Sequence, residues 1–149
     1  MKKILFLIPN LAHGGAERVL VNLANNLDPQ KYDITVQTLF DVGVNRQYLR
    51  SHIHYIPGAK KQFRGNTVLM KFFSPERLYR YIVREKYDVI VSYLEGATSR
   101  IIAGCSDATV KKVAWIHIEL PTPQQAAIGF RNTSEAIRLY NRYNRLISV

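Results

Sequence analysis

Short apolar segments of strand length recur along this chain, and segments with helical periodicity separate them. The first, residues 3–8, is apolar on both faces, as a central strand of a parallel sheet is. Further segments of this kind cover residues 32–40, 53–56, 88–93, 113–117 and 145–149. Because strands that alternate with helices favour parallel pairing, the sequence predicts an α/β fold with a mainly parallel sheet flanked by helices.

Four segments between these strands carry helix signals. After the first strand, apolar residues recur at helical spacing, at Ala16, Val19, Leu20, Leu23, Ala24 and Leu27. Ser74 and Pro75 are typical of an N-cap and a first helical residue, and the buried face expected there is Leu78, Tyr81 and Ile82. Residues 96–105 predict a short helix. Asn132, with Glu135 three residues later, predicts the start of a last helix with Ala136, Leu139, Tyr140 and Tyr143 along one side.

The composition limits the class of protein. A chain of 149 residues is long enough for one domain with a core, and 47% apolar residues exclude a disordered chain. The apolar residues 4–9 are far fewer than the ~18 of a membrane span, and no signal-peptide cleavage site follows them. The single cysteine, Cys105, and the lack of a Cys/His cluster predict a reducing cytoplasm and no metal site. Because the last apolar segment stops partway through a strand, we expect residues 1–149 to be a truncated part of a longer protein.

The strongest local signal is the glycine pair Gly14 and Gly15, between the first strand and its helix. Ligands of open α/β sheets lie beyond the carboxyl ends of the strands, and free N–H groups at a helix N-terminus favour an anion there. Glycines also let the backbone approach a phosphate closely. The alternative is an ordinary tight turn. The loop has neither G-x-G-x-x-G nor the P-loop pattern.

Three more residues are candidates for the same edge of the sheet. His117 ends a predicted strand, where an imidazole can donate or accept a hydrogen bond near neutral pH. Glu95 follows the preceding strand, and His13 precedes the glycine pair. Each has a structural alternative: a histidine without a ligand, a carboxylate in the first turn of a helix, and a loop residue.

Residues 60–73, here called the basic-aromatic segment, interrupt the strand and helix pattern. Cations and aromatic rings alternate in it, and those that suit an anionic membrane surface are Lys60, Lys61, Phe63, Arg64, Lys71 and Phe72. The formal net charge of +10 admits a membrane, a phosphorylated ligand or nucleic acid. The alternative is a solvated loop with a few core anchors.

Taken together, these motifs resemble the N-terminal domain of retaining GT-B glycosyltransferases of family 4. The resemblance rests on the first strand with the Gly-Gly-Ala-Glu run that follows it, on residues 88–96, and on Trp115-Ile116-His117. It implies a Rossmann-like acceptor-side domain over residues 1–149. It also implies that Gly14 and Gly15 face the donor diphosphate and the acceptor, that the catalytic residue His117 lies beside the transferred sugar, and that Glu95 lies near the acceptor.

GT-B enzymes have a second Rossmann-like domain that holds most of the nucleotide-sugar site and carries a Glu-x7-Glu motif. No two glutamates are eight apart here. We therefore expect this chain to lack that domain and to transfer no sugar by itself.

The resemblance further implies a nucleotide-diphosphate sugar as donor and no other cofactor. The acceptor is expected to be a carbohydrate or a lipid-linked sugar in cell-surface polysaccharide or glycolipid synthesis. The expected location is the cytoplasm, with peripheral contact to the inner face of the membrane. The alternative is a non-enzymatic basic α/β module that binds nucleic acid, which only the charge favours, so no nucleic acid is expected.

Overall fold

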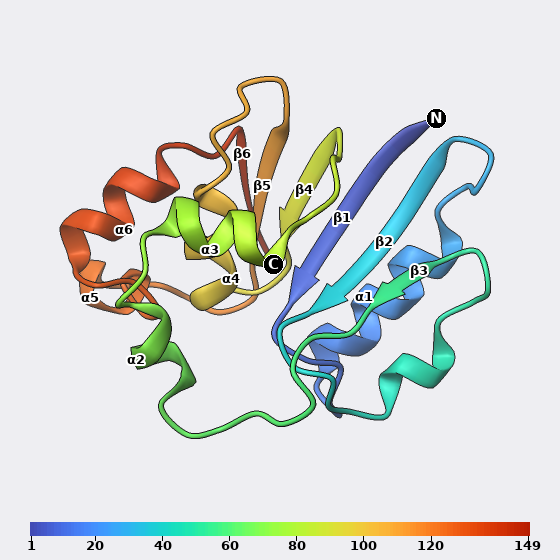
Figure 1. The fold of residues 1–149 in the computed structure, drawn as a ribbon, viewed down its shortest axis with the longest axis horizontal. Helices are drawn as coiled ribbons and strands as arrows, with labels where there is room; N and C mark the ends of the chain where they lie inside the picture. Colours follow the sequence, from blue (N-terminus) through green and yellow to red (C-terminus); the bar gives the residue numbers. More distant parts are fainter.

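A computed structural model describes all residues 1–149, and it shows one six-stranded, all-parallel sheet (Figure 1). The strand order is β3-β2-β1-β4-β5-β6, the order of doubly wound nucleotide-binding sheets. The strands are β1 (Lys2–Ile8), β2 (Tyr32–Thr38), β3 (His54–Ile56), β4 (Val89–Ser92), β5 (Lys111–Ile116) and β6 (Arg145–Ser148). The predicted Rossmann-like α/β fold is therefore confirmed.

All four predicted helices are present, and three short ones were not foreseen. The helices are α1 (Gly15–Asn26), α2 (Asn66–Met70), α3 (Pro75–Ile82), α4 (Ala97–Ala103), α5 (Pro123–Ala126) and α6 (Thr133–Tyr140), with a 3-10 turn at Asn45–Tyr48. Ser74 caps α3 as expected, because its Oγ accepts a hydrogen bond from the Arg77 N–H. The helix α2 lies inside the basic-aromatic segment, whose mixed apolar and cationic residues give no helical stripe.

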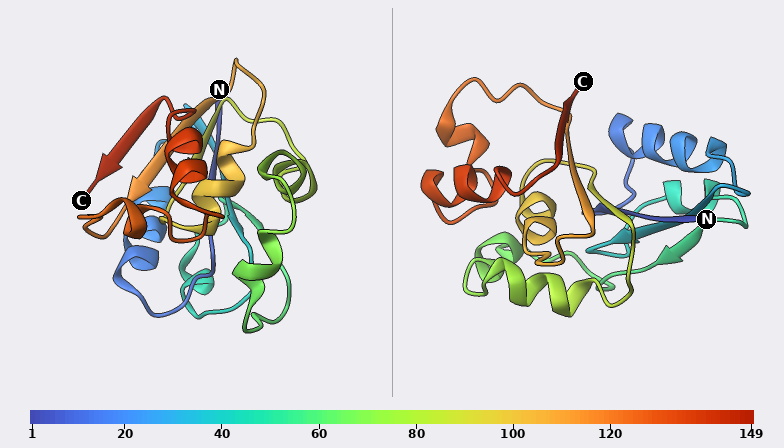
Figure 2. Two further views of the ribbon diagram at one scale, coloured as in Figure 1. Left: turned by 90° about the vertical axis from the view of Figure 1, so that its left-hand side faces the viewer. Right: turned by 90° about the horizontal axis from the view of Figure 1, so that it is seen from above.

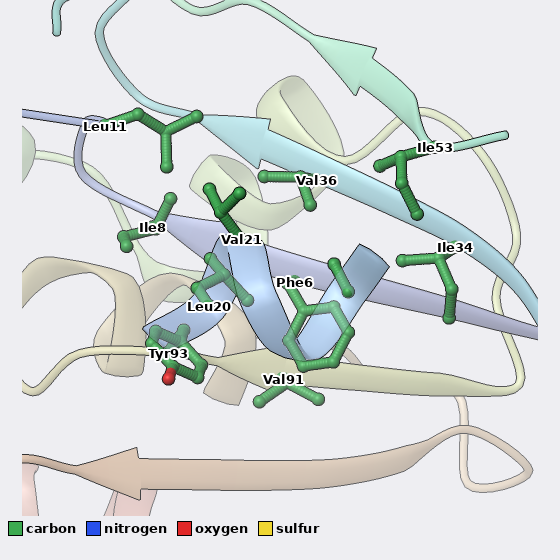
Figure 3. Packing of buried hydrophobic residues seen from close by; sticks show 11 residues of the cluster. Phe6, Ile8, Leu11, Leu20, Val21, Ile34, Val36, Ile53, Val91 and Tyr93 are labelled. Atoms are coloured by element: carbon green, nitrogen blue, oxygen red, sulfur yellow. The ribbon is translucent and has the colours of Figure 1, made fainter. Parts of the chain in front are cut away.

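Helices cover both faces of the sheet (Figure 2). The helix α1 packs on one face, where Leu20 and Ala24 meet Phe6, Ile34 and Val91 (Figure 3). On the other face, Leu78 of α3 and Ile101 of α4 pack against Leu5 and Leu7. No helix is both long enough and apolar enough to cross a membrane.

Two residues expected in buried faces lie in solvent instead. Val19 of α1 is 53% exposed. The buried stripe of α1 consists of Leu20, Val21 and Ala24, so Val21 occupies the place expected for Val19. Tyr81 of α3 is 72% exposed, and Leu78 carries the contact with the core. Periodicity locates the apolar stripe but not its edges, which packing decides.

A buried ion pair joins three distant segments. Arg100 of α4, 1% exposed, donates from Nε to Glu135 Oε1 of α6 at 2.8 Å. Its other nitrogens donate to the carbonyl oxygens of Met70 (3.0 Å) and Phe73 (2.8 Å). Asn132 caps α6 as predicted, but the Glu135 carboxylate accepts from Arg100 and from the Arg131 N–H. The pair therefore fixes the end of the basic-aromatic segment against α4 and α6.

Burial acts to raise the pKa of Glu135, but its hydrogen bonds with Arg100 and the Arg131 N–H outweigh this effect and lower the pKa. The stabilising effect of this carboxylate is complete above its ordinary pKa of 4.5 and disappears as the pH falls through the lower native value.

We expect Glu135→Gln to lower the free energy of unfolding by about 3 kcal/mol at neutral pH, because it leaves the buried Arg100 charge uncompensated. The matched control is Glu76→Gln, which removes the exposed 2.8 Å pair with Arg142 and should cost less than about 1 kcal/mol. Urea unfolding at several pH values measures both. Equal losses for the two variants, or a Glu135→Gln deficit that grows below pH ~4, would contradict the assignment.

Candidate functional site

In open α/β sheets a ligand lies where the strand order reverses, which predicts a binding crevice at the carboxyl ends of β1 and β4. This edge of the sheet is called the crevice below. The chain leaves β1 toward α1 on one face of the sheet and leaves β4 toward α4 on the other, so the two connections part at this point (Figure 1). Gly14 and Gly15 follow β1, Glu95 follows β4 and His117 follows β5. The structure thus brings these predicted residues to one edge of the sheet.

The conformation of the glycine pair does not require glycine. Neither Gly14 nor Gly15 has a positive φ, and a Cβ atom built on Gly15 meets no atom within 4 Å. The three atoms nearest to a Cβ built on Gly14 all belong to the flexible carboxylate of Glu17, which folds back over it. Backbone strain therefore does not explain the pair, although glycine is among the residues favoured at an N-cap such as Gly14.

The N-terminus of α1 has no side-chain cap at this loop, although the Glu17 carboxylate folds back over Gly14. Gly14 is its N-cap and supplies no capping side chain. His13, Gly14 and Gly15 are all exposed, so the first N–H groups of this 12-residue helix face the crevice without a side-chain partner. The nearby Glu17 carboxylate lies where the helix dipole favours negative charge.

A contact with Glu95 fixes the backbone of His117. Its main-chain N–H donates to Glu95 Oε2 at 2.9 Å, which ties the loop after β4 to the end of β5. The Nε2 atom is buried and has no hydrogen-bond partner. Glu95 therefore does not act as a first-turn carboxylate of α4, which begins after Gly96.

Two aromatic residues that sequence reasoning did not assign complete the site. The Tyr93 ring lies 4.8 Å from the His117 ring and 5.2 Å from that of Trp115, and Trp115 stacks on His117 at 6.2 Å. The Tyr93 hydroxyl and the Trp115 Nε1 are also buried without partners. Both residues stand in the strand ends that carry Glu95 and His117, which is the signal that could have identified them.

Burial, and then the charge of Glu17, raises the pKa of Tyr93 to about 12. Its hydroxyl is therefore protonated at neutral pH and can donate. The three unpartnered groups, here called the aromatic triad, are Tyr93, Trp115 and His117. Each such buried group costs ~1–3 kcal/mol unless a hydrogen-bond partner or water satisfies it. Tyr93 is fully buried and belongs to the core beneath α1.

The loop before α4 is rigidly positioned. Ser92 Oγ and Thr98 Oγ1 both donate to the Leu94 carbonyl, at 2.9 and 2.6 Å. Gly96 has φ +102°, a conformation that L side chains rarely adopt. These contacts hold Glu95 against His117.

The basic-aromatic segment leads from β3 to α3 (Figure 1). Lys60, Lys61, Phe63 and Arg64 are exposed, Phe72 is 78% exposed and Lys71 is partly buried. His54 pairs with Asp33 at 3.2 Å, next to β2 and away from the crevice. No three His, Cys, Asp or Glu side chains gather in a way that could hold a metal ion.

Because the Tyr93 hydroxyl has no partner, we expect Tyr93→Phe to raise the free energy of unfolding by about 1 kcal/mol. The control is Tyr143→Phe, which removes a 2.6 Å hydrogen bond to the Ser99 carbonyl and should lower it by about 1 kcal/mol. Urea unfolding separates the two outcomes. Equal destabilisation by both substitutions would show that the Tyr93 hydroxyl already has a partner in the protein.

Comparison with known proteins identifies the family of this chain. The family model described as Glycosyltransferase Family 4 matches residues 13–149, a range that includes the glycine pair, Glu95 and the aromatic triad. No curated protein matches the chain. Membership implies a nucleotide-sugar donor and a sugar acceptor as substrates. The chain belongs to glycosyltransferase family 4.

Proposed function

We propose that this chain is the acceptor-side half of an enzyme that transfers a sugar from a nucleotide-diphosphate sugar to a carbohydrate or lipid-linked acceptor. The observation that carries the proposal is the aromatic triad beside an open glycine loop at one crevice. Hydrogen-bonding groups on aromatic rings suit a sugar, which has hydroxyl groups around an apolar ring. The proposed setting is synthesis of cell-surface polysaccharide or glycolipid.

Each site residue has a distinct role in this proposal. Gly14 and Gly15 present backbone N–H groups to the donor diphosphate or to the acceptor, and Glu17 must swing away from Gly14 when an anion binds there. His117 Nε2 forms a hydrogen bond with the transferred sugar and holds the reacting geometry. Glu95 positions His117 from the acceptor side, and His13 borders the same crevice.

The donor nucleotide is proposed to bind mainly to a second domain. The chain has no pair of glutamates eight apart. Charge that develops on the leaving diphosphate needs cationic or N–H partners, and around this crevice only the α1 N-terminus is evident. We therefore expect residues 1–149 alone to transfer no sugar.

The test is sugar transfer by the protein that contains this chain, supplied with a panel of nucleotide sugars and membrane extract. We expect His117→Ala to lower kcat at least about 100-fold, because it removes a hydrogen bond to the reacting sugar. The control is His54→Ala, at an exposed pair outside the crevice, which should retain activity. Absence of hydrolysis or transfer with every nucleotide sugar would refute the proposed function, and equal loss in both variants would refute the role of His117.

A second proposal is peripheral docking on the inner face of the membrane. The observation that favours it is exposure of the cations Lys60, Lys61 and Arg64 beside Phe63 and Phe72. Cations meet anionic headgroups while rings enter the interface. The alternative of nucleic-acid binding rested on the net charge, and no feature of the structure supports it further.

Vesicle co-sedimentation tests the docking. We expect binding to increase with the fraction of anionic lipid and to fall about 10-fold or more when Lys60 and Lys61 are both replaced by Glu, since each cation near such a surface contributes about 1 kcal/mol. The control replaces Lys2 and Lys31 by Glu. These two lysines are exposed at the opposite edge of the sheet, so binding should be retained. Binding that does not depend on anionic lipid would remove this proposal.

A further inference from the structure

A cavity lies beside the basic-aromatic segment, and none of the crevice residues lines it. It has a volume of about 720 Å³, within the range of about 300–1,000 Å³ that small-molecule sites occupy. It lies between the carboxyl ends of β2 and β3, the loop after β3, α2 and α3. Its apolar lining includes Leu39, Phe40, Ile56, Phe63, Leu69 and Ile82. We call it the α2–α3 groove.

No buried side-chain polar atom in the lining of the groove lacks a hydrogen-bond partner. The Gln37 amide donates to the Ile82 carbonyl at 2.7 Å, and Thr38 Oγ1 is bonded to the Tyr55 hydroxyl and the Gly58 N–H. The aromatic triad, in contrast, contains three buried polar atoms without hydrogen-bond partners. An apolar ligand can therefore enter the groove without leaving a hydrogen bond unmade, whereas a sugar gains little there.

The apolar lining is open to solvent. Phe63 and Leu69 are each 49% exposed, and Phe63 packs edge-on against the buried Phe40 with ring centroids 6.5 Å apart. A ligand chain that covers these side chains removes apolar surface from water.

The charges around the groove are mainly positive. Arg84 lines it, held by a hydrogen bond from Nε to the Tyr81 carbonyl and by its position over the Tyr81 ring at 5.5 Å. The exposed Lys60, Lys61 and Arg64 flank Phe63 in the loop that forms one wall. Glu85 is the only acidic residue in the lining. An occupant with an apolar chain and an anionic head matches this distribution.

We propose that the α2–α3 groove binds one alkyl chain of a phosphate-bearing membrane lipid, with the phosphate at the cations of its rim. The proposal deepens the docking proposed above and rests on it for the source of the lipid. It also goes beyond that docking, because a chain held in a groove is recognised by its length as well as by its charge. The site is separate from the crevice and needs no nucleotide sugar to bind.

Isothermal titration of residues 1–149 with butyl, hexyl and octyl phosphate, each below its micellar concentration, tests the groove without membranes. We expect the affinity to rise about fourfold for each added CH₂ that enters the groove. Inorganic phosphate alone and octyl glucoside should each bind at least 10-fold more weakly than octyl phosphate.

The variant Leu69→Asp should abolish the dependence on chain length, since it places a charge in the apolar lining. Val68→Asp is the matched control, because Val68 is the adjacent residue of α2, is 59% exposed and does not line the groove. Circular dichroism checks that both variants fold. If Leu69→Asp does not fold, Phe63→Ser replaces it as the groove variant.

Equal affinity for all chain lengths, equal effects at positions 68 and 69, or binding of inorganic phosphate as tight as that of octyl phosphate would overturn the proposal. Each outcome leaves sugar transfer untouched. Failure of transfer with chain-length-dependent binding intact would instead overturn the glycosyltransferase proposal and leave the groove in place.

Discussion

Parallel pairing of β1 with β4 determines where the candidate site residues of this domain come together. The register runs from Ile4 against Val89 to Leu7 against Ser92, so the two strands end together. Their connections then turn to opposite faces of the sheet, and the α1 N-terminus, Glu95 and the aromatic triad meet at that division.

Two regions at the carboxyl edge of the sheet have opposite chemistry. The crevice holds three buried polar atoms without partners on aromatic rings, whereas the α2–α3 groove is apolar with its polar groups satisfied. Arg100 connects the two, because it belongs to the helix that follows Glu95 and fixes the carbonyl groups of Met70 and Phe73. The proposed occupants differ accordingly: a sugar at the crevice and an alkyl chain of a membrane lipid at the groove.

Local sequence signals predicted the strands and helices. The side chains that complete the site could be identified only from tertiary contacts in the structure. Alternating apolar segments and the caps at Ser74 and Asn132 identified the strands and four helices, since these signals act within a few residues. The residues of the Arg100–Glu135 pair are 35 positions apart in the sequence, so no local sequence pattern predicts their contact.

The site itself was partly predictable. The positions of Gly14, Gly15, Glu95 and His117 follow from the rule that parallel strands end at one edge. That Tyr93 and Trp115 keep unpartnered polar atoms could not be read from the sequence, because aromatic residues in strands are usually core. The contact between Glu95 and the His117 backbone was likewise hidden, since it depends on the exact path of two loops.

The most direct measurement of the central claim is the sugar-transfer rate of Gly15→Ala relative to the unchanged protein, with the free energy of unfolding measured on both. The fold leaves open space for a Cβ there and the backbone does not require glycine, so stability should be retained within about 1 kcal/mol. If a ligand approaches this backbone, transfer should fall at least about 10-fold, as it does when a reacting geometry is displaced. Unchanged transfer in a stable variant would contradict the claim that the glycine pair faces a substrate.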